Sequence, residues 1–186
     1  YHTSAIQSNG TLWTWGYNFY GELGTSDLTY RSSPVQIGLS LWKQVSAGNI
    51  HTAAIQSNGT LWTWGYGGTG GLGNNSTTNY SSPIQIGTSL WSQVAASRLY
   101  SAAIQSNGTL WSWGNNGFGQ LGTSDITQRN SPVQIGSNLW KQVACGYQHT
   151  AAIQSDGTLW SWGYNAYGGL GNNSSTNQSS PVQVGS

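Results

Sequence analysis

The chain alternates short runs of apolar and polar residues with Gly, Asn and Ser, a pattern that predicts β-strands. Near the start, residues 4–7 and 11–15 have strand character and flank Ser8-Asn9-Gly10. An Asn-Gly pair between two strands predicts a hairpin with a type I′ turn, because both residues tolerate positive φ. No segment shows the periodicity of an amphipathic helix, so we expect an all-β fold.

Two further strands are predicted at residues 34–38 and 41–48, and the first of them begins with Pro34. A proline at the start of a strand removes no hydrogen bond from the ladder. Within residues 11–15, Leu12 and Thr14 point to one face and the two tryptophans to the other. Large side chains on both faces indicate a sheet covered on both sides, as in the stacked blades of a propeller.

This four-strand pattern occurs four times at a spacing of 49 residues. A tryptophan marks the end of the second strand in each repeat, at Trp15, Trp64, Trp113 and Trp162. A repeat of this length predicts one structural unit per repeat that buries its faces against its neighbours. The predicted blades are 1–49, 50–98, 99–147 and an incomplete 148–186, or about 3.8 blades of a β-propeller.

A second period of 98 residues lies within the first. Blades 1 and 3 share Gly-Thr-Ser-Asp at 24–27 and 122–125, whereas blades 2 and 4 share Gly-Gly-Leu-Gly-Asn-Asn-Ser at 70–76 and 168–174. We call the first kind A blades and the second kind B blades. Strict alternation of two kinds favours an even number of blades in a closed ring.

Several motifs in fixed order resemble the RCC1 repeat family. They are His-Thr-Ala-Ala-Ile at 51–55, Asp-Gly-Thr-Leu-Trp-Ser-Trp-Gly at 156–163, and the recurring Gly-x-Leu-Gly, Ser-Pro-Val-Gln and Trp-x-Gln-Val-x-Ala-Gly. The resemblance implies a β-propeller, commonly of seven blades. The family includes a nucleotide exchange factor for a small GTPase, bacterial secreted propellers and many surface proteins. No residue here matches the acidic and His residues of the exchange factor, and the Thr-Leu-Trp-x-Trp-Gly motif resembles bacterial or phage versions.

Both ends of the chain are expected to leave unpaired blade edges, which natural sheets avoid. The chain begins inside a first strand and stops just after the strand at 181–184. Three arrangements follow: an excerpt of a longer repeat array, which we favour, a two-chain ring of eight blades, or a ring closed by four blades alone. Self-association through the open blade edges is therefore one predicted mode of interaction.

Composition excludes several classes of function. Charged residues make up 5% of the chain and the net charge is +1, so we expect no nucleic-acid surface. No apolar run approaches the roughly 20 residues of a membrane helix, so no membrane insertion is expected. The single Cys145 takes the place of Ala47 and Ala96 in the other repeats, which indicates a small buried strand position.

The polar residues predict no catalytic, metal or cofactor site. His2, His51 and His149 share one repeat position with Tyr100, and equivalent positions of a propeller lie too far apart to share an ion at bonds of roughly 2 Å. We expect these histidines to pack and to form hydrogen bonds at the strand start. The four acidic residues include no carboxylate pair suited to acid–base chemistry. The Gly-x-Leu-Gly segments lack a following Lys or helix, so we expect their glycines to supply backbone angles rather than a phosphate cradle.

Aromatic residues in the loops that follow each Trp-Gly are the candidate ligand contacts, since binding sites on rigid scaffolds usually lie in loops. They are Tyr17, Phe19, Tyr20, Tyr66, Phe118, Tyr164 and Tyr167. The alternative is that several of these side chains fill the gaps between blades.

Low charge, high symmetry and richness in Asn, Ser and Thr favour a non-enzymatic module for protein binding or structural display. We expect it in a secreted, cell-surface or virion protein. A multivalent carbohydrate-binding module of lectin type is the first alternative, because repeated aromatic loops would add avidity for a glycan. A regulator or inhibitor of a partner enzyme is the second, and it rests on fold analogy.

Overall fold

The computed structural model describes residues 1–185, and Ser186 lies outside the described residues. Within this range the chain forms thirteen β-strands and no helix, so the all-β prediction is confirmed. The strands are β1 (His2–Ile6), β2 (Leu12–Gly16), β3 (Arg31–Gln36), β4 (Trp42–Ala47), β5 (His51–Gln56), β6 (Thr60–Gly65), β7 (Tyr80–Ala96), β8 (Tyr100–Gln105), β9 (Thr109–Gly114), β10 (Arg129–Cys145), β11 (His149–Gln154), β12 (Leu159–Gly163) and β13 (Gln178–Val184).

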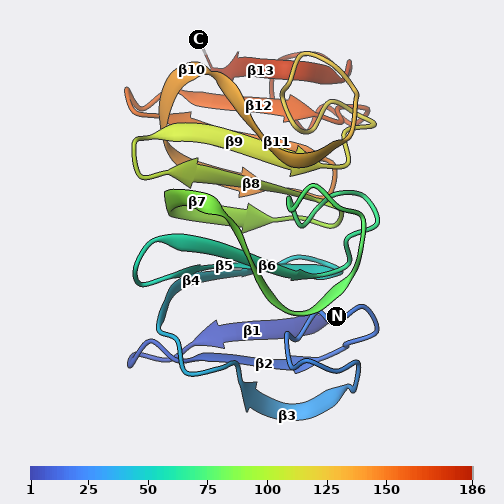
Figure 1. Cartoon of the computed structure of the whole chain (residues 1–186). Helices are drawn as coiled ribbons and strands as arrows, with labels where there is room; N and C mark the ends of the chain where they lie inside the picture. Colours follow the sequence, from blue (N-terminus) through green and yellow to red (C-terminus); the bar gives the residue numbers. More distant parts are fainter. Residues whose placement is uncertain (186) are drawn as a thin grey trace.

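The strand pairs form four antiparallel sheets stacked in a row, with the first sheet and the last at opposite ends of the molecule (Figure 1). Strands β1, β2 and β3 make the first sheet. The long strands β7 and β10 each give their first half to one sheet and their second half to the next. Strands β4 to β13 are therefore one continuous hydrogen-bonded series. Small sheets stacked face to face are the arrangement of propeller blades.

The sheets and the sequence repeats differ in phase by one strand. The last strand of the first repeat, β4, pairs with β5 of the second repeat, in a register that places Val45 opposite Ala54. The halves of β7 and β10 that correspond to β4 pair in the same way with β8 and β11. As a result the last three sheets have four strands each, and the first sheet has three.

The hairpin between β1 and β2 is not the predicted type I′ turn. Gly10 has a φ of +86°, but Ser8 and Asn9 do not adopt positive φ. The Gly10 N–H donates to Gln7 O at 2.8 Å, which closes a turn that ends in one left-handed residue, as in a three-residue hairpin loop. The Asn9 side chain instead accepts from the N–H of Thr11 at 3.1 Å. Asparagine therefore serves as a side-chain acceptor here, and only glycine takes the left-handed conformation.

The third strand also begins earlier than predicted. Strand β3 starts at Arg31, three residues before Pro34, so the proline lies inside the strand. The register between β2 and β3 shifts between the pairs Thr14–Val35 and Gly16–Arg31. Pro34 falls in this irregular segment, where a missing N–H costs no ladder bond.

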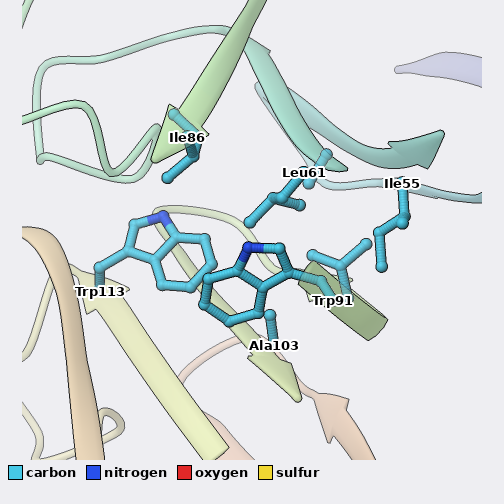
Figure 2. Packing of buried hydrophobic residues seen from close by; sticks show 8 residues of the cluster. Ile55, Leu61, Ile86, Trp91, Ala103 and Trp113 are labelled. Atoms are coloured by element: carbon cyan, nitrogen blue, oxygen red, sulfur yellow. The ribbon is translucent and has the colours of Figure 1, made fainter. Parts of the chain in front are cut away.

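Each inner sheet buries both of its faces, as the side chains of its second strand predict. Leu61 on one face of β6 and Trp64 on the other are both fully buried. Leu61 belongs to the same cluster as Trp113 of the next blade. Figure 2 shows Trp91 of β7 lying beside Trp113, and their rings meet edge to face with centroids 6.1 Å apart. Tryptophan rings and aliphatic side chains packed between neighbouring sheets therefore form the core.

In the first three Gly-x-Leu-Gly segments, one backbone carbonyl is the acceptor for the following blade. A hydroxyl in the first strand donates at all three boundaries, and the tryptophan at the end of the second strand donates at the first two. At 2.8–2.9 Å, Trp64 Nε1 and Thr52 Oγ1 donate to Glu22 O, Trp113 Nε1 and Ser101 Oγ to Gly71 O, and Thr150 Oγ1 to Gln120 O. We call this acceptor the interblade carbonyl.

The glycine that ends the same segment lies against the tryptophan ring. Gly73 has a φ of +78°, and a Cβ at this position would lie 2.7 Å from Trp113 Nε1. Only glycine combines this backbone conformation with so close an approach. The prediction that these glycines supply backbone angles is confirmed.

An aspartate closes the loop between the second and third strands of each A blade. Asp125 Oδ1 accepts from the N–H of Thr127 at 2.9 Å, and Oδ2 pairs with Arg129 at 2.5 Å. Both members of the ion pair are about one-third exposed, at 27% and 37%. An ion pair this open to solvent adds little stability, so the hydrogen bond to the loop backbone is the more important contact.

We expect Asp125→Ala to lower the free energy of unfolding by about 1–2 kcal/mol, because it removes the acceptor for Thr127. Arg129→Ala should cost less than about 1 kcal/mol. Asp125→Ser is the matched control, since Ser174 accepts from Thr176 N at 3.0 Å at the same position of a B blade. Urea denaturation measures all three variants. A larger loss for Arg129→Ala than for Asp125→Ala would contradict this account.

Candidate interaction site

The seven candidate aromatic residues lie in the loops between the second and third strands, at the same end of each blade. The structure gathers them into two groups. The first group contains Tyr17, Phe19, Tyr20 and Tyr66, and the second contains Phe118, Tyr164 and Tyr167.

The first group runs from blade 1 to blade 2. The ring centroids of Phe19 and Tyr20 are 4.9 Å apart, and those of Tyr20 and Tyr66 are 4.8 Å apart, both edge to face. Phe19 is 56% exposed, whereas its two neighbours are partly buried. The group thus bridges two blades and still presents an aromatic surface to solvent.

Two members of this surface were missed in the sequence analysis. Tyr30 lies with its ring centroid 4.9 Å from that of Tyr17, and Tyr1 lies 6.2 Å from it. Tyr1 precedes β1 and Tyr30 precedes β3, and both strands pair with the end of β2, so both rings come to the loop from neighbouring strands. We call Tyr1, Tyr17, Phe19, Tyr20, Tyr30 and Tyr66 the aromatic surface.

A hollow of about 570 Å³ opens beside the aromatic surface. Its lining includes Tyr1, Tyr17, Tyr20, Tyr30, Arg31 and Ile50. The guanidinium of Arg31 is paired with Asp27 at 2.6 Å, so its charge is largely satisfied within the loop. The hollow therefore offers ring faces and phenol hydroxyls rather than a free charge.

The aromatic surface is where two otherwise similar A blades differ most in chemistry. Asn115, Gly117 and Gln128 of blade 3 take the places of Tyr17, Phe19 and Tyr30 in blade 1. The strands around them are nearly identical in sequence, so the fold does not require these three aromatic side chains. Comparing the repeats position by position would have found Tyr30.

A buried carboxylate holds the loop that carries this surface. Glu22 is fully buried, and its Oε2 accepts from the N–H of Tyr20 at 2.8 Å. Burial raises the pKa of Glu22 above its ordinary value. In blade 3 the amide of Gln120 accepts from Phe118 N at 2.9 Å in the same way. Because the neutral amide of Gln120 accepts the same backbone hydrogen bond, the charge of Glu22 is not needed for this contact, and Glu22 acts by positioning the loop.

All three histidines lie at the start of a first strand, and the rings of His2 and His51 form hydrogen bonds to the next blade. His51 Nε2 lies 2.8 Å from Ser101 Oγ, and His2 Nε2 lies 2.7 Å from Thr52 Oγ1. Burial lowers the pKa of both imidazoles to about 4. Each ring therefore stays neutral near pH 7 and supports the hydroxyl that donates to an interblade carbonyl.

Cys145 is the last residue of β10, and the residue as a whole is partly buried. Burial of its thiol raises the pKa to about 12, so it stays protonated near neutral pH. Its Sγ lies 3.6 Å from Ala95 O on the neighbouring blade.

Among residues 1–185 no three His, Cys, Asp or Glu side chains group as metal ligands. No helix long and apolar enough to cross a membrane occurs in the same range.

Comparison with protein families decides the relationship. The family model described as the regulator of chromosome condensation (RCC1) repeat matches residues 9–55, 58–104, 107–153 and 156–186. The chain belongs to the RCC1 repeat family. A second model of the same repeat matches 42–70, 91–120 and 140–168. Among curated protein sequences, none matches the chain.

Solved structures of RCC1 propellers share the fold. Human WBSCR16 is 22% identical with a TM-score of 0.90, and the match covers 100% of this chain and 51% of that protein. Yeast RCC1 (Prp20) bound to Kap60 is 20% identical with a TM-score of 0.84, covering 100% of this chain and 47% of Prp20. A second structure of Prp20p from Saccharomyces cerevisiae has a TM-score of 0.85 at 20% identity, and the match covers 100% of this chain and 48% of that protein. The chain spans about half the length of these proteins, and the predicted β-propeller class is confirmed.

Proposed function

We propose that this RCC1 repeat chain is a non-enzymatic protein-binding module, and that the aromatic surface contacts the partner. The observation that carries the proposal is the cluster of six aromatic rings around an open hollow, present in one A blade and reduced in the other. Aromatic side chains supply large contact area with little conformational entropy to lose, and they are enriched at protein interfaces.

The relatives support a protein partner. Yeast RCC1 (Prp20) is bound to Kap60 in one of the solved structures, and the structure of Prp20p was described together with its binding properties to Gsp1p and histones. For the present chain the partner is defined by its chemistry. It should present an apolar or aromatic protrusion without strong net charge, because Arg31, the one Lys or Arg side chain among the described residues that line the hollow, is already paired with Asp27.

The test replaces three aromatic residues of blade 1 by the residues that occupy the same positions in blade 3. The variant Tyr17→Asn/Phe19→Gly/Tyr30→Gln is expected to keep the wild-type melting temperature within a few degrees and to bind the partner at least about 30-fold more weakly. Tyr167→Ala is the control, since Tyr167 is 92% exposed in the other group. Partners are captured from the host, purified, and titrated against each variant by calorimetry. Equal affinity of wild type and triple variant would contradict the proposal.

A carbohydrate-binding module is the second candidate, and one observation favours it. The pairs Tyr20–Tyr66 and Phe118–Tyr164 have nearly equal centroid distances, 4.8 and 5.0 Å, in equivalent A–B positions. Two such sites on one chain would bind a multivalent glycan with gain in avidity. A broad glycan array probed with the wild-type chain tests it, and absence of binding to any glycan would reject it.

We further propose a secreted, cell-surface or virion setting, with an origin among bacterial or phage members of the family. Composition supports the setting, with few charges and many Asn, Ser and Thr residues on a rigid scaffold, and the Thr-Leu-Trp-x-Trp-Gly motif supports the origin. Fractionation of the source followed by immunodetection of the chain tests the setting. Detection only in the cytosol would reject it.

A further inference from the structure

The same hollow occurs at two boundaries between neighbouring blades. Between blades 2 and 3 it has a volume of about 290 Å³, and its lining includes two tryptophans, a glutamine and a proline: Trp91, Trp111, Gln105 and Pro132. Between blades 3 and 4 it has a volume of about 220 Å³, and the equivalent residues line it: Trp140, Trp160, Gln154 and Pro181. Both walls of each hollow belong to blades that the structure describes, so the hollows are a property of the boundary itself.

Two tryptophan rings form the apolar part of each hollow. Trp91 is 2% exposed, and its ring meets the partly exposed ring of Trp111 edge to face with centroids 6.4 Å apart. Trp140 and Trp160 repeat this arrangement at the same distance. The Nε1 of Trp111 donates to Thr109 Oγ1 at 2.9 Å, so its N–H is used within its own blade while its ring borders the hollow.

The first tryptophan of each pair has a buried N–H without an acceptor. Neither Trp91 Nε1 nor Trp140 Nε1 makes a hydrogen bond among residues 1–185, whereas Trp113 Nε1 donates to Gly71 O. Figure 2 shows the nitrogen of Trp91 on the edge of the ring that faces Ile86, another residue of the hollow. Because buried indole N–H groups usually have a partner, these two indicate an acceptor that a ligand supplies.

A glutamine amide is a second donor in each hollow. Gln154 is 8% exposed, and its Nε2 has no hydrogen-bond partner among residues 1–185. Gln105 accepts from Thr109 Oγ1 at 3.5 Å through its Oε1, and its Nε2 donates to no residue in the same range. Among the described residues that line either hollow there is no Lys, Arg, His, Asp or Glu. The hollows are therefore neutral, and their unpartnered buried groups are all N–H donors.

The charge distribution of the hollows determines which ligand complements them. The partial positive charge of the N–H groups calls for acceptors, the lack of ionised side chains calls for a neutral ligand, and the tryptophan rings call for an apolar one. A proline residue meets these requirements, since its carbonyl accepts, its nitrogen carries no hydrogen and its ring is apolar. Proline-rich segments also adopt a preformed extended conformation that docks into aromatic-lined grooves. A sugar is a poorer complement, because each hydroxyl group brings a donor together with its acceptor.

We propose that the hollows between blades 2 and 3 and between blades 3 and 4 bind proline-rich segments of a protein partner. The N–H groups of Trp91 and Trp140 and the two glutamine amides donate to carbonyls of the segment, and its proline rings pack against Trp111 and Trp160. Two equivalent hollows on one rigid scaffold allow a partner with two such segments to bind with a gain in avidity.

The inference goes beyond the proposed function because the hollows lie away from the aromatic surface. Gly87, which lines the first hollow, precedes Leu90, and Leu90 pairs with Thr60 at the start of β6. The loop that carries Tyr66 follows Gly65 at the other end of β6. A substitution at one site is therefore not expected to change binding at the other.

Titration of the whole protein with a neutral decaproline peptide, blocked at both ends, tests the proposal without any substitution. In proton–nitrogen correlation spectra, the indole N–H signals of Trp91 and Trp140 should move downfield, because each N–H gains an acceptor. The signal of Trp113 should stay in place, since its N–H is already bonded to Gly71 O. Unchanged Trp91 and Trp140 signals at millimolar peptide would overturn the proposal. A response of these signals to N-acetylglucosamine and not to the peptide would assign the hollows to a sugar and would also overturn it.

A pair of variants tests the glutamine donors by calorimetry. Gln105→Leu/Gln154→Leu should keep the wild-type melting temperature within a few degrees and bind decaproline at least about 10-fold more weakly. Gln128→Leu is the matched control, because Gln128 is exposed in the loop of blade 3 and lines neither hollow. The triple variant of the aromatic surface should bind decaproline like the wild type, which separates a failure of this proposal from a failure of the proposed function. Equal affinity of the double variant and the wild type, or an equal loss in the control, would refute the role of the hollows.

Discussion

Replacing Trp113 by alanine is expected to lower the free energy of unfolding by about 3–5 kcal/mol, the largest effect of any substitution considered. The side chain is fully buried at the boundary between blades 2 and 3. It meets Trp91 edge to face at 6.1 Å, and its Nε1 donates to Gly71 O at 2.9 Å. Truncation would leave a cavity between two rigid sheets, which cannot collapse far because their strands are hydrogen-bonded.

Trp15 supplies a matched control for Trp113 within the same chain. It occupies the equivalent position of the first blade, where no preceding blade lies within residues 1–185, and it is partly exposed. Trp15→Ala should cost less than half as much as Trp113→Ala. Urea denaturation followed by circular dichroism measures both, at a dilution where native mass shows single chains. Equal losses would mean that the tryptophan stabilises its own blade and not the boundary.

The architecture could be predicted from the sequence because each blade carries its own copy of the same information. The spacing of Trp15, Trp64, Trp113 and Trp162 sets the unit, and large side chains on both faces of the second strand require a neighbour on each side. The pairing of β4 with β5 was not foreseen, since a periodic sequence does not say where one sheet ends and the next begins.

The predictions of local structure that were wrong concern residue types that suit two different backbone settings. Asparagine tolerates positive φ and also accepts hydrogen bonds through its side chain, and Asn9 uses the second property. Proline suits a strand start and also an irregular segment, and Pro34 lies in the second setting. Sequence pattern alone does not choose between such uses, because the choice depends on the register of the partner strand.

The candidate site could be predicted only as a set of loops. The seven aromatic residues were found from their place after each Trp-Gly, but their division into two groups depends on contacts between blades, such as Tyr20 with Tyr66. Tyr1 and Tyr30 come from strand ends that pair with β2, at a distance in sequence. Whether these rings contact a partner stays a prediction.

Acid is expected to destabilise the chain through His51. The imidazole is fully buried beside Ser101, and burial lowers its pKa from 6.5 to about 4. The unfolded chain therefore binds a proton between these pH values that the folded chain does not bind. Stability is complete above pH 6.5, falls as the pH decreases to 4, and levels off below that for this group. The loss amounts to about 3 kcal/mol.

His51→Gln removes this proton and keeps a hydrogen-bonding group near Ser101, and His51→Tyr copies Tyr100, which occupies the same position in blade 3. Both variants should lose about half of the difference in unfolding free energy between pH 7 and pH 4.5 that the two buried histidines cause, as measured by urea denaturation at each pH. His2, whose pKa burial also lowers to about 4, remains in both variants and accounts for the other half. If either folded variant keeps the full wild-type pH dependence, the acid sensitivity arises from other groups, and His51 is not the residue that links protonation to the boundary between blades 2 and 3.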